Sequence, residues 1–129
     1  MPMVRVSNGG TAATLLWTNS SPSAAFAPQT ISLSLSNYDH ILIVGKRLTA
    51  DSITTYTDTL GAGGTARDVY KISGNTGANQ NAFGSGSTYR YITISTSGIF
   101  FAQGYQGGTA RNDAAVPLYI YGLKLGGIY

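Results

Sequence analysis

Residues 29–44 have the sequence QTISLSLSNYDHILIV, and this stretch decides the fold. Over residues 29–35, polar and apolar side chains alternate without interruption. A period of two is the signature of a strand that buries one face. We therefore predict a strand whose core-facing side chains are Ile31, Leu33 and Leu35.

The remainder of the stretch predicts a turn and a second strand. Residues 37–39 (NYD) favour a turn, because Asn and Asp side chains hydrogen-bond to their own backbone in tight turns. Residues 40–44 (HILIV) follow and are apolar on both faces. This pattern suits a central strand that is buried on both sides.

Along the rest of the chain, short apolar runs alternate with clusters of Gly, Ser, Asn and Pro, which is typical of an antiparallel β domain. Residues 96–98 (TSG) predict a tight hairpin. Residues 19–28 are expected to be a loop, and so are residues 74–87, with Phe83 as their apolar anchor. Further strands are expected at residues 14–18, 53–59, 68–72, 88–94, 99–103 and 118–125.

The chain has the size of one domain, residues 1–129, and no window of it predicts a helix. The succession of short strands and turns therefore predicts an all-β fold, an antiparallel β-sandwich with jelly-roll-like topology. The predicted core consists of apolar side chains from these strands: Ile31, Leu33, Leu35, Ile41, Ile43, Ile92, Ile94, Phe101, Leu123 and Leu125.

The composition is poor in charge and argues against several classes of function. Charged residues make up 10% of the chain, against about 25% in a typical soluble domain. The eight Lys and Arg are scattered, so we expect no nucleic-acid binding. No apolar run approaches the roughly 18 residues that span a membrane, so we expect no membrane insertion. The start of the chain lacks the apolar stretch of a signal peptide, and export by assembly or lysis is expected instead.

Residues for catalysis or metal binding are sparse. Cys is absent, so disulfides and thiolate metal sites are excluded, and His40 is the one histidine. On a strand, the adjacent Asp39 and His40 should point to opposite faces, which argues against a His–Asp–Ser system. The five Asp are dispersed and nominate no carboxylate pair and no calcium loop. We expect no catalytic residue, no metal and no cofactor.

A repeat and a group of aromatic residues are the candidate binding features. The tetrapeptide GGTA occurs at residues 9–12, 63–66 and 107–110, and the last two copies are followed by Arg. Either these loops present Arg and Asp to a ligand, or Gly-Gly-Thr is hairpin chemistry. Tyr is amphipathic and enriched at binding sites, although it is also a good strand residue. The candidate ligand-binding residues are Arg67, Tyr105 and Arg111, from the loops at residues 61–67 and 104–113, together with Tyr89 and Tyr91.

Both ends of the chain resemble small structural proteins of tailed bacteriophages. The resemblance is carried by residues 16–22 (LWTNSSP), 26–33 (FAPQTISL), 38–43 (YDHILI) and 117–124 (PLYIYGLK). In those proteins such a segment opens a β domain at the end of tail or fibre proteins, and the closing segment is the final strand. These are packing motifs, so the resemblance implies an architecture and a virion setting and carries over no active residue.

The expected function follows from the resemblance together with the aromatic-rich final third of the chain. We expect a phage virion protein of tail-fibre or adhesin type that binds a host-surface glycan or docks onto other virion proteins. A capsid decoration or fibre protein and a phage-encoded polysaccharide hydrolase are the alternatives. A surface this poor in charge also predicts burial between like subunits, and phage fibres resembling this chain are threefold, so a homotrimer is expected.

Overall fold

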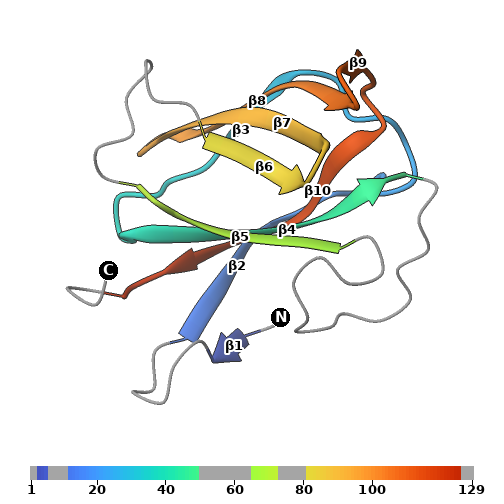
Figure 1. The fold of residues 1–129 in the computed structure, drawn as a ribbon. Helices are drawn as coiled ribbons and strands as arrows, with labels where there is room; N and C mark the ends of the chain where they lie inside the picture. Colours follow the sequence, from blue (N-terminus) through green and yellow to red (C-terminus); the bar gives the residue numbers. More distant parts are fainter. Residues whose placement is uncertain (1–2, 6–11, 50–64, 73–80, 126–129) are drawn as a thin grey trace.

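The computed structural model describes residues 3–5, 12–49, 65–72 and 81–125. These ranges form two antiparallel sheets that pack face to face, as Figure 1 shows. The predicted all-β fold and the sandwich of two sheets are confirmed. No element in the described ranges is a helix that could span a bilayer.

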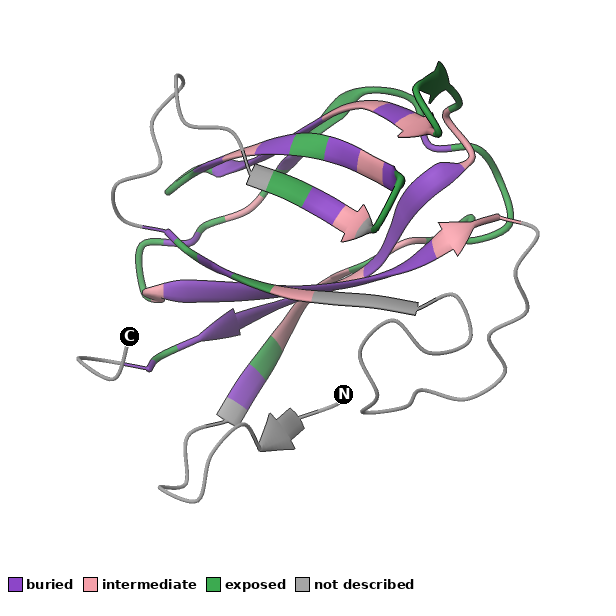
Figure 2. Ribbon diagram, viewed as in Figure 1, coloured by how far each residue is buried: buried purple, intermediate pink, exposed green. Residues whose placement is uncertain are grey.

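Sheet A has the strand order β1–β2–β10–β4–β5. Its central pair, β4 and β10, is buried along almost its whole length (Figure 2), which confirms that residues 40–44 lie in a strand buried on both sides. The strands are β1 (Met3–Arg5), β2 (Ala12–Thr18), β4 (His40–Leu48), β5 (Thr65–Lys71) and β10 (Ala114–Leu123).

Sheet B has the order β3–β8–β7–β6, with the short β9 paired to β8. The predicted hairpin is confirmed, because β7 and β8 are joined by residues 96 and 97 and pair directly. The strands are β3 (Gln29–Ser32), β6 (Asn81–Ser85), β7 (Thr88–Ser95), β8 (Gly98–Gln106) and β9 (Thr109–Ala110).

The jelly-roll part of the prediction is not confirmed. In sheet B, β6, β7 and β8 are neighbours both in the sheet and along the chain, and in sheet A the same holds for β4 and β5. A jelly roll is built from two Greek keys, in which long connections bring non-consecutive strands together. Long connections do bring β10 between β2 and β4, and β3 beside β8. The other neighbours in both sheets follow the order of the chain, so the two Greek keys of a jelly roll are not shown.

The main core lies between the sheets, and a second apolar cluster lies on the other side of sheet A. Alternate residues of β4 divide between the two: Ile41 and Ile43 belong to the main core, and Leu42 and Val44 to the second cluster. All of the predicted core residues are buried except Leu33, which is half-buried and packs against the main core. Leu123 and Leu125 belong to the second cluster and the other predicted residues to the main core, so period-two patterning predicted burial but not which side of sheet A is buried.

One predicted loop contains a strand. Residues 81–85 of the expected loop 74–87 form β6, which pairs along its length with β7. The anchor Phe83 is fully buried in the main core, and Ala82 before it is exposed, as strand alternation requires. The Gly- and Ser-rich composition hid this strand, although the sequence carried a signal for it: Gly86 and Ser87 form the two-residue turn of a β6–β7 hairpin. The strand expected at residues 53–59 lies outside the described residues.

Side chains of β5 close the gap between the sheets at β6. The Tyr70 hydroxyl donates to the carbonyl of Ala82 at 2.8 Å, and the Asp68 carboxylate accepts from the Gly84 N–H at 3.3 Å. Both backbone groups belong to the edge strand of sheet B. Because these two backbone groups are hydrogen-bonded to side chains, they are not available for pairing with another strand at this edge.

Candidate functional site

The outer face of sheet B carries a group of aromatic side chains. Along β7, residues 88, 90, 92 and 94 are buried, whereas Tyr89 and Tyr91 lie on the opposite, solvent side. Tyr105 of β8 is the register partner of Tyr89 and therefore shares its face. The predicted trio of tyrosines thus comes together on one surface.

The three tyrosine rings contact one another. The Tyr89 and Tyr105 rings are stacked, with centroids 5.6 Å apart and an angle of 23° between their planes. The Tyr89 and Tyr91 rings meet edge to face at 5.5 Å. Such contacts restrict ring rotation, so the cluster is a preformed surface.

A fourth aromatic residue, Phe100, extends this surface and was missed by the sequence analysis. Phe100 pairs with Thr93, which lies two residues from Tyr91 on the same face of β7. Phe100 and Tyr91 are each 42% exposed. The signal was available, because a buried Phe101 places its neighbour Phe100 on the other side of the strand. We call Tyr89, Tyr91, Tyr105 and Phe100 the aromatic face.

The two candidate arginines do not join the aromatic face. Arg67 lies on β5 of sheet A, where its backbone pairs with Val44, and its side chain is outside the described part. Arg111 directly follows β9, in which Ala110 pairs with Tyr105. The Arg111 side chain contacts Gln106, which follows Tyr105 on β8 and therefore points to the opposite side of that strand from Tyr105.

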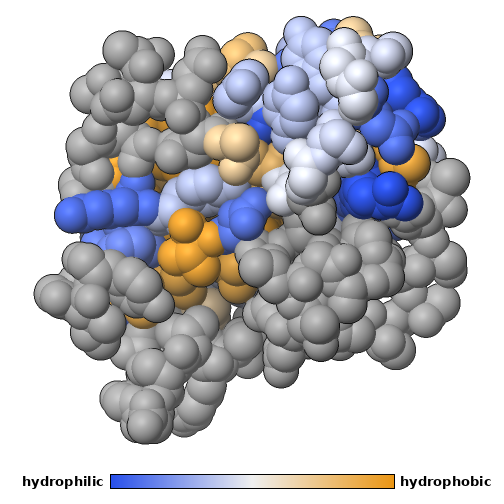
Figure 3. All heavy atoms as spheres, in the orientation of Figure 1, coloured by the Kyte–Doolittle hydropathy of each residue, from blue (hydrophilic) through white to orange (hydrophobic). Residues whose placement is uncertain are grey.

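The contacts of Arg111 agree with that placement. Its guanidinium donates to both carboxylate oxygens of Asp113, at 2.9 and 2.7 Å, and to the side-chain oxygen of Gln106 at 2.6 Å. The hydrogen bonds to Asp113 raise the pKa of Arg111, and the Arg111 guanidinium lowers the pKa of Asp113. The pair is therefore charge-neutral as a unit. Hydrophilic residues gather at this end of the molecule, near β9 (Figure 3).

The third copy of the GGTA repeat is a hairpin turn. Gly107 and Gly108 connect β8 to β9 with φ values of 58° and 84°. L-residues other than Asn and Asp rarely adopt such values, so this copy fits the turn-chemistry alternative. The first two copies lie largely outside the described residues.

A buried arginine, Arg90, clamps the end of sheet B from the inside. It is fully buried on β7, and its guanidinium donates to the carbonyls of Phe26, Ala102, Asn112 and Ala114 at 2.7 to 3.3 Å. The guanidinium also lies 5.3 Å from the centre of the Phe26 ring. Burial lowers the pKa of Arg90 to about 10. Composition gave no sign of this role, since an isolated arginine normally indicates an exposed position.

The clamp leaves no room for a side chain at Gly104. A Cβ at that position would lie 2.4 Å from the Arg111 carbonyl oxygen and 2.9 Å from an Arg90 nitrogen. The close approach lets the Gly104 carbonyl accept the Arg111 N–H at 2.8 Å. Arg90 and Gly104 together fix residues 111–114 against β8, the strand that carries Tyr105.

Asp39 and His40 contact each other, contrary to the prediction. His40 Nδ1 lies 2.7 Å from Asp39 Oδ1. The alternation argument was wrong here because Asp39 precedes β4 and is not part of a strand. The same oxygen accepts the Leu125 N–H at 2.8 Å, and His40 is buried. The pair therefore ties the end of β10 to the start of β4, and its imidazole does not face solvent.

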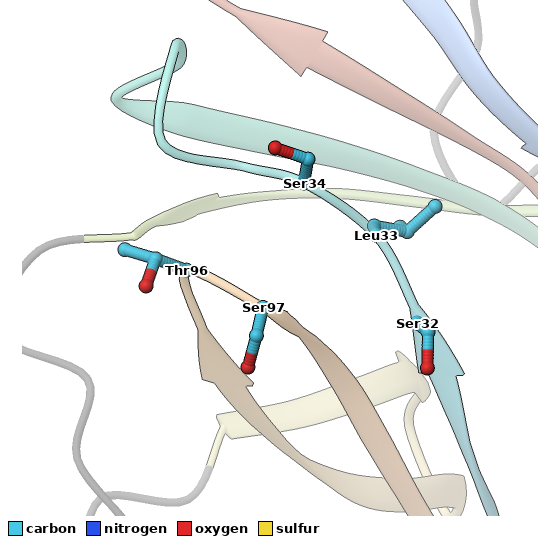
Figure 4. A pocket seen from close by; sticks show the side chains of 5 residues that line it. All are labelled: Ser32, Leu33, Ser34, Thr96 and Ser97. Carbon is cyan, nitrogen blue, oxygen red and sulfur yellow. The ribbon is translucent and has the colours of Figure 1, made fainter.

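A shallow hollow lies where β3 leaves sheet B, beside the β7–β8 turn (Figure 4). It is lined by Ser32, Leu33, Ser34, Thr96 and Ser97, and in Figure 4 the Ser34 hydroxyl points in a different direction from those of Ser32, Thr96 and Ser97. The hollow has no charged or aromatic lining. It therefore offers a ligand less than the aromatic face does.

Within the described ranges, no group of three His, Cys, Asp or Glu residues could hold a metal ion.

No protein-family model matches the chain. No curated protein is significantly similar to it, and no solved structure matches it significantly. The resemblance to phage structural proteins therefore stays a prediction, and function must be argued from the geometry.

Proposed function

We propose that the chain is a virion protein of a tailed bacteriophage, of tail-fibre or adhesin type, and that its aromatic face binds a glycan of the host surface without cleaving it. The observation that carries this proposal is the preformed cluster of Tyr89, Tyr91 and Tyr105, extended by the exposed Phe100. Sugar rings carry C–H faces that pack on aromatic rings and hydroxyls that bond to phenolic oxygens.

Exposure of these rings supports a binding role. A soluble protein gains nothing in stability from large aromatic side chains that stay in water. Exposed patches of this kind mark binding surfaces in proteins more often than chance predicts. The aromatic face lies on paired strands rather than on a loop, so it is held rigidly, as a binding surface must be to limit the entropy lost on binding.

The virion setting rests on the resemblance of residues 16–22, 26–33, 38–43 and 117–124 to phage structural proteins. In a virion, a further surface of the chain would dock onto other virion proteins. A head-decoration protein would share this setting and bind capsid instead of cells. Labelled protein that binds host cells supports the adhesin, whereas labelled protein that binds only capsids supports decoration.

The hydrolase alternative has no support from the described carboxylates. Asp39 is bonded to His40, Asp68 to Tyr70, and Asp113 to Arg111. A glycosidase needs two carboxyl groups that flank one bond, with one of them kept protonated. No observation in the described ranges favours that arrangement over binding alone.

A homotrimer belongs to the same proposal. Eight Lys and Arg and five Asp give the chain an unusually uncharged surface, part of which would be covered in a threefold assembly. Light scattering over a range of concentrations should give a mass three times that of the 13.5 kDa chain. A mass of one chain at every concentration would overturn the trimer.

Glycan binding is tested with an array of bacterial surface polysaccharides and labelled protein. We expect binding to at least one polysaccharide, and its loss in the double variant Tyr89→Ala/Tyr105→Ala. Val69→Ala is the matched control, because Val69 is 49% exposed on β5 of the other sheet. Absence of binding to every polysaccharide, or release of sugars from one, would contradict the proposal.

A further inference from the structure

Charge is distributed very unevenly between the two sheets. From residue 72 to residue 110, a segment that contains β6, β7, β8 and β9, the sequence has one charged residue, Arg90. Residues 6–38, which contain β3, have none. Because Arg90 is fully buried, no strand of sheet B presents a charged side chain to solvent.

The surroundings of the aromatic face are uncharged on every side. The register neighbours that share this face are Thr30, Thr93 and Ala110, from β3, β7 and β9. On β6, Ala82 and Gly84 pair with Tyr91 and Tyr89. The polar groups on offer are therefore uncharged: phenolic and aliphatic hydroxyls, and the amide of Gln103, which lies two residues before Tyr105 on β8.

The nearest charged pair lies on the other side of the ribbon. Arg111 is engaged by Asp113 through two hydrogen bonds and by Gln106 through a third. Asp113 cancels the charge of Arg111, and the contact with Gln106 holds the Arg111 side chain on the side of β8 opposite to Tyr105. An anionic ligand on the aromatic face would thus find no uncompensated cation among the described residues beside it.

On the basis of the proposed function, we infer that the aromatic face binds an uncharged glycan, made of neutral pyranose units, and not an acidic polysaccharide. An acidic sugar that packs its ring on the aromatic face must give up part of the hydration of its carboxylate or phosphate. Without an opposing charge that cost is not offset. A neutral sugar gives up only hydroxyl hydration, which Tyr and Thr hydroxyls can replace.

The length of the aromatic face favours a chain of sugars. From Tyr89 to Thr93, the partner of Phe100, is four residues along β7, or roughly 13 Å at about 3.3 Å per residue. This exceeds the width of one pyranose ring. A polysaccharide or an oligosaccharide repeat therefore uses more of the face than a monosaccharide does.

The test compares two sets of soluble probes by affinity electrophoresis with the full chain. The neutral set is dextran, mannan, galactan and glycogen, and the acidic set is alginate, pectate, polysialic acid and teichoic acid. Any probe that binds is measured again at low and high salt, since salt screens charge–charge attraction. We expect a neutral probe to bind with unchanged affinity at high salt, and Tyr89→Ala to weaken it about tenfold.

Variants separate the possible outcomes. Arg111→Ala should leave the affinity for the neutral probe unchanged, and Val69→Ala is the fold control. Binding of acidic probes alone, or equal losses in Arg111→Ala and Tyr89→Ala, would overturn the inference while leaving glycan binding in place. No binding of either set would overturn the proposed function itself. A Tyr89→Ala protein with a changed oligomeric mass would show that a second copy covers the face.

Discussion

The two sheets of this sandwich differ in what their outer faces do. The outer face of sheet A is covered at its centre, where Leu42 and Val44 are almost fully buried in the second apolar cluster, and open at its edge strand β5, where Val69 is 49% exposed. The outer face of sheet B is open, with Phe100 and Tyr91 each 42% exposed. Sheet A also carries exposed charges such as Lys71, whereas sheet B carries its one charge inside.

The two sheets thus divide between a layer that stabilises the fold and a layer whose outer face is proposed to bind a ligand. Sheet A buries side chains on both faces, as strands of a central layer do, and therefore contributes most of the apolar burial per strand. Sheet B buries one face and leaves rigid aromatic rings in water. The strands of sheet B contain one charged residue, Arg90, and their outer face is the surface that is proposed to bind a neutral ligand.

The largest effect is expected inside sheet B, at its one charge. Arg90→Ala removes the donor for the carbonyls of Phe26, Ala102, Asn112 and Ala114 and should cost about 3–5 kcal/mol of unfolding free energy. Urea unfolding measures the loss. Arg111→Ala is the control, because its solvent-exposed ion pair contributes little. Equal midpoints for the two variants would show that Arg90 is not a clamp.

The second effect tests the two outer faces directly. Leu42→Ala on sheet A should cost about 2–5 kcal/mol, since it leaves a cavity in a packed cluster. Phe100→Ala on sheet B should stay within about 0.5 kcal/mol, since the side chain is 42% exposed and its removal leaves no cavity inside a packed cluster. Thermal or urea unfolding gives both values. If Phe100→Ala were as costly as Leu42→Ala, the aromatic face would be part of a core.

A smaller effect is expected from a change of pH at Asp68, whose side chain on β5 of sheet A contacts β6 of sheet B. Burial raises the pKa of Asp68 above its ordinary value of 3.8. Between the unfolded and folded pKa values, the native state binds more protons, so the contribution of Asp68 to stability falls as pH rises through that window. Melting temperatures of wild type and Asp68→Asn, measured from neutral pH to about pH 4, should differ with this slope.

Asp113 is the control, because its contribution to stability changes with pH in the opposite direction from that of Asp68. Its pKa is lowered by the Arg111 hydrogen bond, so its contribution is present above the unfolded pKa and is lost as pH falls through the folded pKa. Asp113→Asn should therefore remove a loss of stability that wild type shows below about pH 4, and this pair is compared down to about pH 2. Difference curves of the same sign would refute the placement of Asp68 between the sheets.

The smallest effect is expected at the β8–β9 turn. Gly107 has a φ of 58°, and nothing lies within 4 Å of a Cβ built there. Gly107→Ala should cost about 1 kcal/mol, and Gly107→Asn less, because Asn accepts the left-handed conformation. Glycan affinity should not change in either variant. A loss of affinity with stability intact would favour the alternative in which the repeat presents a ligand loop.

Sequence periodicity alone determined the all-β class, the buried strand at residues 40–44 and nearly all of the core list. These features follow from side-chain alternation, which is a local property and is visible in one strand at a time. The grouping of the tyrosines was also expected, and the absence of charge from residue 72 to residue 110, apart from Arg90, is plain in the sequence.

Tertiary structure alone decided the rest, because it depends on which distant segments meet. Arg90 is a clamp because four carbonyls from residues 26 and 102–114 converge on it. The contact of Arg111 with Gln106 holds its side chain away from the aromatic face. Register between strands sets the face of each side chain, and a one-residue difference in register reverses it.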